Sequence, residues 1–499
     1  MSYKMNLSDL KRDGDTSLTQ QLVDRFVAAI ESGDLPPGEK LPPTRRLAEE
    51  VGVNHLTAAR VYRKLAELGY VSASLGRGTF VRSLAPAGST ELGDDWQVYA
   101  LPEREIAYPE QVLADAFSVD EPGLLSLATG WPSPTTYPVE ELGRIAADVF
   151  AEEGVNVLSY LPAEGLYALR EQLAKRGRRF GYATEPDEIV VTSGAQQGLR
   201  LAAEATLEEG DVAVVESPSF IGMIGSLRAT GARVIGVPVD EHGLDVDALE
   251  RLLSRHEVKL VALQTASHNP TGCDLAPDRG RRLAEMAMER NFFVLEDQVY
   301  ADTRLEGERP RSLRELAPAH VIHVSSLSKV VGPGLRVGWV AARGPISDRI
   351  AMAKLLADFQ TSTLTQHLAA RWLASGAHDR HEKKTVPFYR QRRDALMDAL
   401  ERHLPGEYRA ESPKGGHHVW VTLTRPLDER TLYSEAARHG VTFTPGGAVT
   451  PERRSQTALR LSYPLLSPDE LDEGVRRLAR AIREVRRRAR HSVAAAPIS

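Results

Sequence analysis

The 499-residue chain has little cysteine and no long apolar run. Its one cysteine, Cys273, excludes an internal disulfide and a structural zinc site built on cysteines. No apolar stretch approaches the roughly 18 residues that a membrane-spanning helix needs. The first residues, MSYKMNLSDLKRDGD, lack the apolar core of a secretion signal. These absences lead us to expect a soluble, cytoplasmic protein with no membrane partner.

What is present is the composition of an ordinary globular protein, with 42% hydrophobic and 26% charged residues. This excludes wholesale disorder, collagen-like repeats and a miniature disulfide scaffold. The length predicts about three domains. Because residues 83–118 mix proline, glycine, serine and acids with little periodicity, they are expected to form a linker. The linker separates residues 1–82 from a body that we divide into residues 119–345 and 346–499.

Charge is distributed unevenly along the chain. Residues 40–82 contain eight basic and three acidic side chains, an excess of five positive charges. Since the whole chain has a net charge of −6, the remainder carries −11. A basic module on an acidic body fits a polyanion partner such as nucleic acid, and it also fits an ordinary solvated face.

The pattern of residues 16–82 predicts three helices followed by a two-stranded wing. The first helix has apolar side chains at a four-residue step: Leu18, Leu22, Phe26 and Ile30. A short helix is expected over residues 44–51, with Thr44 as its N-cap and Gly52 in the following tight turn. The third helix starts near Asn54 and is expected to turn these side chains inward: Leu56, Ala59, Tyr62, Leu65 and Leu68. A helix–turn–helix with a wing is a DNA-binding arrangement.

Beyond residue 120, strand-like runs alternate with amphipathic helical runs. Seven strands are predicted, at residues 188–194, 211–218, 232–239, 259–265, 292–297, 320–326 and 336–342. This alternation predicts an α/β fold with a mostly parallel sheet covered by helices. After about residue 345 the chain is mainly helical and then offers HHVWVTL, VTFTP and ALRLSY as strands, which predicts a smaller α+β domain.

The C-terminal stretch from Arg476 to Arg490 holds eight arginines against Glu484. We expect a helix with an exposed basic face. A second contact with nucleic acid is the alternative interpretation.

Polar motifs follow several of the predicted strands, where ligands bind in open α/β sheets. They are SGAQQ at 193–197, NPTG at 269–272, DQVY at 297–300, SLSK at 326–329, GLRVG at 334–338 and LRLSY at 459–463. Each is common alone, as a turn, a helix cap or a solvated loop. Together and in this order they resemble the fold-type I aminotransferase family of pyridoxal 5′-phosphate (PLP) proteins, over roughly residues 120–485.

The resemblance implies PLP as cofactor and gives individual residues a role toward it. Lys329 matches the lysine whose amine bonds the PLP aldehyde, which makes it the one catalytic residue we expect. Asp297 matches the carboxylate that keeps the ring nitrogen protonated. Asn269 and Tyr300 match the donors to the ring oxygen. The phosphate is expected to lie against the residues that match its ligands: Gly194, Ala195, Ser326 and Arg336.

Three further residues complete this expected site. Tyr160 resembles a tyrosine that reaches the cofactor phosphate of the neighbouring subunit, which requires a homodimer. Arg460 matches the arginine that binds a substrate or effector carboxylate with both arms of its guanidinium, a task that lysine performs poorly. Phe220 is a departure, because many relatives have a tyrosine at or near that position. The change keeps stacking on the cofactor and loses a hydroxyl.

Residues 16–82 independently resemble the GntR-type winged helix–turn–helix, through the pattern LPPTRRLAEEVGVNHLTAARVYRKLAELGYV followed by GRGTFV. The resemblance implies a double-stranded DNA operator as partner. The residues that match the family's DNA contacts are Arg45, Asn54, His55, Thr57, Gly76, Arg77 and Gly78. Many relatives have serine or threonine and then arginine in place of Asn54-His55. Asparagine can read adenine and histidine can reach guanine or a phosphate, so the operator sequence is left open.

Four histidines lack the neighbouring ligands that a metal site requires: His378, His381, His417 and His418. They are interpreted as surface or packing residues, and no metal is expected. Cys273, next to the NPTG motif, is interpreted as inert packing.

A GntR-type head linked to an aminotransferase-like body resembles the MocR subfamily of bacterial regulators. The resemblance implies a transcriptional regulator whose body senses an amino compound or PLP. An active aminotransferase with an accessory head is the alternative function, and a sensor of PLP alone is a third.

Overall fold

The computed structural model describes residues 17–32, 34–36, 39–74, 78–81, 112, 123–451 and 456–494. The chain divides into two units, Met1–Glu105 and Ile106–Ser499, which are called the head and the body below. The division falls within the predicted linker at 83–118, of which only Val112 is among the described residues.

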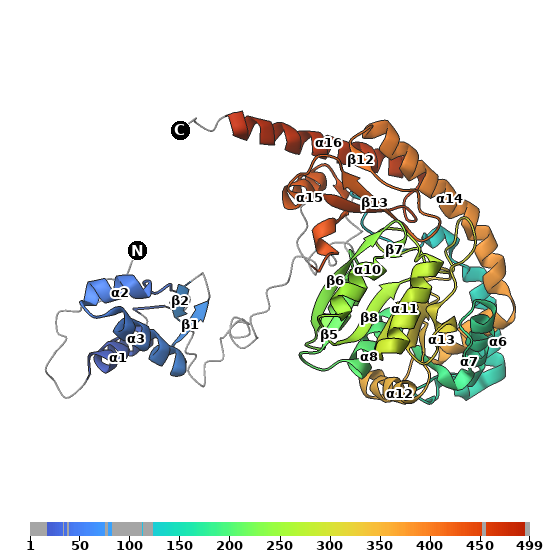
Figure 1. The fold of residues 1–499 in the computed structure, drawn as a ribbon, viewed down its shortest axis with the longest axis horizontal. Coiled ribbons are helices and arrows are strands. Elements are labelled where there is room, and N and C mark those ends of the chain that lie inside the picture. The colour runs from blue at the N-terminus through green and yellow to red at the C-terminus, as the bar shows by residue number, and fades with distance from the viewer. Residues whose placement is uncertain are drawn as a thin grey trace. The chain divides into compact units, whose positions relative to one another are not determined.

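The head contains the three helices and two strands that the sequence predicts, all labelled in Figure 1. They are α1 (Leu18–Glu31), α2 (Thr44–Val51), α3 (His55–Glu67), β1 (Val71–Ser74) and β2 (Gly78–Val81). The two strands pair antiparallel, with Val71 opposite Val81. Gly52 takes the left-handed conformation (φ 67°) that lets α2 turn into α3. The wing tip, with Gly76 and Arg77, lies outside the described residues.

Two details of the head differ from the expectation. The N-cap of α2 is Pro43 and not Thr44, because the Pro43 carbonyl already accepts a hydrogen bond from the Leu47 N–H. The inward face of α3 is also rotated, since Leu56 is 64% exposed and Leu68 is 52% exposed. The residues of α3 that enter the core are Ala58, Val61, Tyr62 and Leu65.

The body is built on an eight-stranded sheet with the order β4-β11-β10-β9-β8-β5-β6-β7. The strands are β4 (Ile189–Thr192), β5 (Val212–Ser217), β6 (Arg233–Asp240), β7 (Gly243–Leu244), β8 (Val258–Gln264), β9 (Phe293–Asp297), β10 (Val321–Ser326) and β11 (Gly338–Ala341). Pairing is parallel from β10 through β6, which confirms the predicted parallel sheet. Strand β11 runs antiparallel to both of its neighbours, and β7 runs antiparallel to β6.

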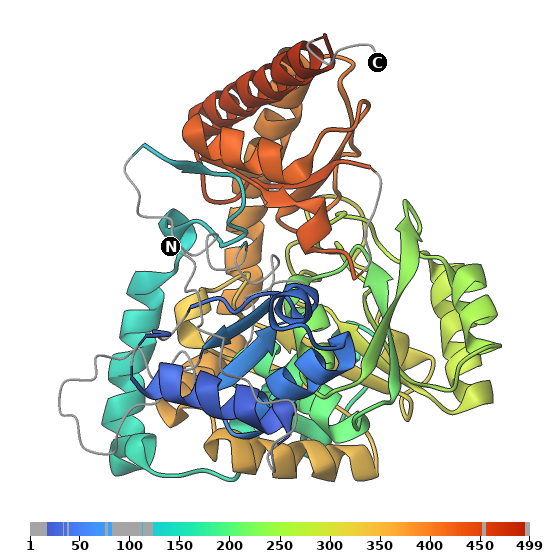
Figure 2. The same cartoon turned by 90° about the vertical axis from the view of Figure 1, so that its left-hand side faces the viewer.

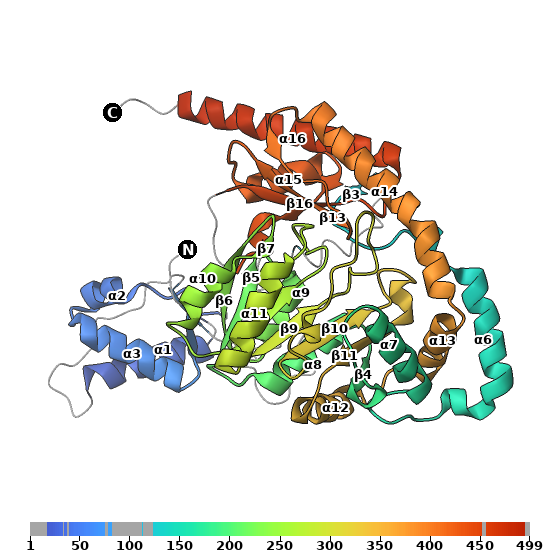
Figure 3. The ribbon, with the colours of Figure 1, turned by 45° about the vertical axis from the view of Figure 1, so that its right-hand side comes forward.

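Helices cover both faces of this sheet, as a buried parallel sheet requires. They are α6 (Val139–Glu153), α7 (Tyr167–Arg179), α8 (Ala195–Thr206), α9 (Ile221–Arg228), α10 (Val246–Leu253), α11 (Pro277–Arg290), α12 (Pro345–Asp358) and α13 (Thr363–Ala374). Alternate residues of β5 point to opposite faces: Ala213 packs in the core under α8, α9 and α12, and Val214 packs in the core under α10 and α11. Figure 3 shows α10 and α11 on the near face.

A second, four-stranded antiparallel sheet, β12-β13-β16-β15, forms the smaller part of the body. Its elements are β12 (Tyr408–Arg409), β13 (His418–Leu423), β15 (Thr444–Pro445), β16 (Ala458–Ser462), α14 (Ala377–His403), α15 (Glu429–Arg438) and α16 (Pro468–Ala494). In Figure 2, α14 (orange) and α16 (red) lie side by side. This confirms the predicted α+β character of the C-terminal region.

Two segments lie on the other side of the boundary that was drawn at residue 345. Helix α13 and all of α12 except its first residue fall within 346–499, yet they pack in the cores of the large sheet, through Trp372 and Ile350. Conversely, β3 (Leu125–Ser126) pairs with β14 (Val441–Thr442). Leu127 belongs to the core of the smaller sheet, so that region also takes in the start of the body.

No helix in the described part of the chain is long and apolar enough to cross a membrane.

Candidate functional site

Three parallel strands end side by side and bring their polar terminal residues together. Gln264 ends β8, Asp297 ends β9 and Ser326 ends β10. Gln264 lies directly opposite Asp297 in the register of the sheet. The carboxyl edge of the sheet is therefore a polar site, as the motifs predict.

Asp297 is a buried carboxylate held only by neutral donors. The Gln264 side-chain amide donates to Oδ2 at 2.7 Å, and the Val299 N–H donates to Oδ1 at 3.0 Å. Among the described residues no basic group lies within ion-pairing distance of it. Burial raises the pKa of Asp297 to about 6, which these hydrogen bonds and the positive charge of Lys329 oppose. The site thus holds an acceptor that favours a cationic N–H donor.

Lys329 lies in the connection from β10 to β11 and points into the same site. Its Nζ donates to the Gly130 carbonyl at 3.1 Å and sits 5.3 Å from the centre of the Tyr300 ring. Burial and the nearby charge of Arg460 lower the pKa of Lys329 to about 8, against the opposing effect of Asp297. A lysine amine with a lowered pKa is available as a nucleophile near neutral pH.

Arg460, on β16, links the smaller sheet to the site. Its guanidinium donates to Asn269 Oδ1 at 3.0 Å, to the Ala128 carbonyl at 2.6 Å and to Thr444 Oγ1 at 2.8 Å. The side chain is buried, and its Nε atom has no hydrogen-bond partner among the residues that the structure describes. Burial lowers the pKa of Arg460 to about 10, so it keeps its charge at neutral pH.

Two histidines border the site, and both are buried, in line with the packing interpretation and not with the surface one. His418 Nε2 lies 3.0 Å from the Tyr300 hydroxyl, and its Nδ1 lies 2.9 Å from Ser462 Oγ. His417 Nδ1 lies 3.1 Å from the Gly130 carbonyl. Burial and nearby positive charges lower the pKa of His417 to about 3 and that of His418 well below its usual value, so both are neutral.

The remaining two histidines are also buried. His378 lies 3.4 Å from Asp302, and His381 lies 3.0 Å from the Val330 carbonyl. Their role is packing within the body, in line with one of the two interpretations. The described residues contain no cluster of three or more side chains fit to bind a metal.

The predicted phosphate ligands lie around the N-terminus of α8. Gly194, at φ 95°, caps the helix, and Arg336 donates to the preceding Ser193 carbonyl at 2.6 Å. A Cβ atom on Gly194 would lie 2.6 Å from the Arg336 guanidinium, and one on Gly338 would lie 2.6 Å from the Gly194 backbone. The free N–H groups from Ala195 onward and this arginine make a cradle for an anion. Ser326 lies opposite Gly338 in the register of β10 and β11, with Oγ accepting from the Ser328 N–H.

Two predicted residues have no described contact with this site. Tyr160 follows the short 3₁₀ turn Gly154–Leu158, and 85% of its side chain is exposed. Phe220 is the N-cap residue of α9, is half-buried and packs against the large-sheet core.

The predicted DNA contacts of the head have different surroundings. Arg45 on α2 and His55 on α3 are exposed, Thr57 is half-buried, and Gly78 begins β2. Asn54 is the N-cap of α3, and its Oδ1 accepts a hydrogen bond from the Leu56 N–H. That oxygen is therefore engaged within the helix.

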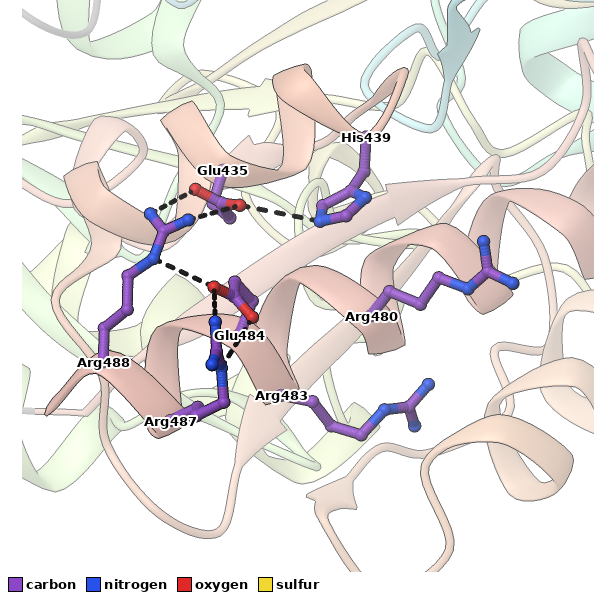
Figure 4. A pocket seen from close by; sticks show the side chains of 7 residues that line it. All are labelled: Glu435, His439, Arg480, Arg483, Glu484, Arg487 and Arg488. Atoms are coloured by element: carbon purple, nitrogen blue, oxygen red, sulfur yellow. Dashed lines mark hydrogen bonds and ion pairs between the residues drawn. The ribbon is translucent and has the colours of Figure 1, made fainter. Parts of the chain in front are cut away.

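The C-terminal arginines form a helix as predicted, but much of their charge is neutralised. Arg488 pairs with Glu435 and Glu484, and Arg487 pairs with Glu484, as Figure 4 shows. Three more pair with acids elsewhere: Arg476 and Arg477 with Glu473, and Arg486 with Glu407. Arg480 and Arg483 are exposed and have no ion-pair partner in the described part of the chain. A shallow hollow of about 490 Å³ is lined by Glu435, His439, Arg480, Arg483, Glu484, Arg487 and Arg488.

Comparison with known proteins divides the chain at the same place. Residues 123–478 match the model of the aminotransferase class I and II family, and residues 18–81 match that of the gntR family of bacterial regulatory proteins. The chain belongs to the class I and II aminotransferase family. Its head makes it a GntR-type transcriptional regulator of the MocR kind, because HTH-type regulators match along nearly the whole length.

The relatives are of two kinds. TauR of Rhodobacter capsulatus is 29% identical over 94% of this chain and 97% of its own. The 2-aminoadipate transaminase of Thermus thermophilus is 37% identical and covers only 72% of this regulator. The structure of LysN, an α-aminoadipate aminotransferase from the same species complexed with N-(5′-phosphopyridoxyl)-L-leucine, has a TM-score of 0.70 and 35% identity over 75% of this chain and 95% of its own. Since the enzymes match the body alone, the regulator interpretation is favoured over an enzyme with an accessory head.

The family implies PLP, and the residues of the regulator fit it. The site combines three separate features: a buried carboxylate with no ion-pair partner in the described part of the chain, a lysine of lowered pKa and an anion cradle. PLP has a matching group for each, in its ring nitrogen, its aldehyde and its phosphate. Gly338 adds to the fit, since only glycine allows β11 to approach the cradle so closely.

Four residues that border the site were not assigned to it from the sequence: Gln264, Gly130, His417 and His418. Gln264 holds Asp297 and also accepts from the Asn269 N–H at 2.8 Å. Gly130 supplies the carbonyl that Lys329 and His417 contact, and a Cβ atom there would overlap His418. A polar residue that ends the apolar run KLVALQ was a usable signal for Gln264. No residue pattern near Gly130 or His418 in the sequence indicates that either one borders the site.

Proposed function

We propose that the body of this regulator binds PLP covalently through Lys329 and that the bound state controls how the head binds its operator. The observation that carries the proposal is Asp297, a buried carboxylate with a pKa raised to about 6 and no cationic partner among the described residues. Without a cationic ligand beside it, the ionised Asp297 carboxylate lowers the stability of the folded chain, because burying an unpaired charge costs free energy.

Each residue has a stated task in the proposal. When bound, PLP supplies an electrophilic aldehyde and an electron-withdrawing ring. Asp297 would accept a hydrogen bond from the protonated ring nitrogen, and Gln264 keeps the carboxylate oriented. Lys329 would bond the PLP aldehyde through its neutral amine, with loss of water, and its pKa of about 8 makes that neutral form accessible at neutral pH. Asn269 and Tyr300 orient the ring through its oxygen.

The effector class is an amino compound with a carboxylate. Arg460 carries the full guanidinium charge in a buried place, 3.0 Å from Asn269. A carboxylate ligand would replace the contacts with the Ala128 carbonyl and Thr444, which are neutral acceptors. The effector then acts through its different affinity for the two arrangements of the protein.

A homodimer is part of the proposal. Large apolar side chains of the body are strongly exposed on two segments, Val155 and Leu158 on one and Leu356 and Phe359 on the other. The segments adjoin, because Thr363 donates to the Ser159 carbonyl at 2.8 Å. A second copy seated there would cover the apolar side chains and bring Tyr160 into contact with its neighbour. Light scattering of the full chain should give twice the chain mass of 54.8 kDa.

The test places two assays side by side on the full chain. One follows conversion of PLP to pyridoxamine phosphate with a panel of amino acids, and the other measures binding to DNA from the region flanking its own gene. Sequence-specific binding that changes with PLP or an amine supports the proposal. Rapid conversion with no specific DNA binding supports the aminotransferase alternative and overturns it.

A further inference from the structure

Helix α3, the recognition helix of a helix–turn–helix, presents an unexpected residue to solvent. Its buried face is defined by Ala58, Val61, Tyr62 and Leu65. At 3.6 residues per turn, Leu56 lies almost diametrically opposite the centre of that face. Leu56 is 64% exposed, although it stands in the first turn of the helix, where side chains reach base edges.

The charges around Leu56 favour DNA as the partner of this face. Arg60 and Arg63 lie four and seven residues further along, on the same side of α3, and both are exposed. Neither has an ion-pair or hydrogen-bond partner among the described residues of the head. A leucine followed by two such arginines on one side of a helix fits a DNA groove, because phosphates line the rim of the groove.

The neighbouring polar residue is less suited to reading a base. Asn54 uses one lone pair of its side-chain oxygen to cap α3, so bidentate recognition of an adenine would need the second lone pair with the amide held in the orientation that the cap sets. His55 and Thr57 lie to the two sides of the Leu56 stripe, as the helix geometry places them. The outermost side chain of the first turn is therefore apolar.

We propose that Leu56 reads the C5-methyl group of a thymine in the major groove of the operator, and that Arg60 and Arg63 hold the adjacent phosphates. Among base edges in the major groove, thymine is the one that presents a methyl group, so an apolar side chain selects it over the other three. This inference rests on the proposed binding of the head to an operator and assigns one of its specificity-determining residues.

The experiment begins with a duplex selected from random DNA by the full chain. Each thymine of that duplex is then replaced singly by deoxyuridine, which removes the methyl group and leaves base pairing intact. Affinities are measured for the wild-type chain, for Leu56→Ala and for Leu68→Ala. Leu68 is a matched control, because it is a leucine 52% exposed at the opposite end of the same helix.

At one thymine per half-site, deoxyuridine should weaken wild-type binding on the order of fourfold, as the loss of one buried methyl group predicts. The Leu56→Ala chain should bind the unmodified duplex more weakly and show no further loss at that thymine. The Leu68→Ala chain should behave like the wild type. Thermal unfolding should be unchanged in both variants, since both side chains are exposed.

Two outcomes separate failure of this inference from failure of the proposed function. If no duplex is selected, the proposed operator binding is wrong. If a duplex is selected and the wild type and Leu56→Ala lose the same affinity at every deoxyuridine, Leu56 reads no methyl group. A change in oligomeric mass on Leu56→Ala, with DNA affinity unchanged, would assign this side chain to a protein contact and equally overturn the inference.

Discussion

Replacing Asp297 by asparagine should stabilise the cofactor-free chain while it weakens PLP binding. The folded protein raises the pKa of this carboxyl from 3.8 to about 6. That difference corresponds to roughly 3 kcal/mol of destabilisation when the group is ionised. Asparagine has no charge to bury. Its NH₂ group, however, would face one of the two N–H groups that donate to Asp297, and that hydrogen bond would be lost. Subtracting about 1 kcal/mol for that lost hydrogen bond leaves a net gain of about 2 kcal/mol at neutral pH.

The difference in stability between Asp297→Asn and the wild type should depend on pH in a characteristic way. Because the folded pKa of Asp297 is raised, the contribution of its proton to stability is complete below about pH 4. This stabilisation is lost as the pH rises from about 4 to about 6. Above pH 6 the contribution of Asp297 to the free energy of unfolding no longer changes with pH. The advantage of Asp297→Asn over the wild type should therefore grow from pH 4 to pH 6 and then level off.

Denaturant unfolding of the cofactor-free chains at several pH values measures this difference. Absorbance titration with PLP should show the opposite order, with affinity reduced on the order of 10- to 100-fold for Asp297→Asn through loss of a charge-assisted hydrogen bond. If Asp297→Asn is less stable than the wild type at pH 7, or if its stability advantage does not vary with pH, then burial of the Asp297 charge does not destabilise the cofactor-free chain.

Three further predictions concern the head and the cradle. DNA affinity should fall steeply with rising salt, and Arg45→Ala should reduce both the affinity and the salt slope, by about one counterion per lost phosphate contact, in binding isotherms at several salt concentrations. Asn54→Ala should destabilise the head by about 1 kcal/mol in thermal unfolding, and Asn54→Ser should restore most of it, because serine also caps a helix. Gly338→Ala should lower PLP affinity in absorbance titrations, since its Cβ would press on the Gly194 backbone, whereas Gly334→Ala, with open space at its Cβ, should not.

The sequence predicted the carboxyl edge of the sheet well because buried strands leave long apolar runs that end in polar residues. Asp297 and Lys329 each follow such a run, so their strands bring them together whatever the details of packing. The phase of α3 was predicted less well. Periodicity alone allowed Leu56 to face inward, and its exposure follows from the side of α3 that the rest of the head covers.

Pairing over long sequence distances was beyond the reach of the sequence. The arginines of α16 read as a basic face, yet Arg486 and Arg488 pair with Glu407 and Glu435, which lie 79 and 53 residues away. His418 reaches Tyr300 from the smaller sheet, 118 residues further along the chain. The two arginine pairs depend on how α16 packs within the smaller part of the body, and the His418–Tyr300 contact depends on how the two sheets pack together; no local pattern encodes either.

Lys329 is expected to couple the body to DNA binding. The most direct measurement is the affinity of the full chain for its operator with and without PLP, for the wild type and for Lys329→Ala. The account predicts that PLP changes the affinity of the wild type, and that Lys329→Ala binds the operator without responding to PLP. The account is contradicted if PLP shifts the affinity of Lys329→Ala as much as that of the wild type.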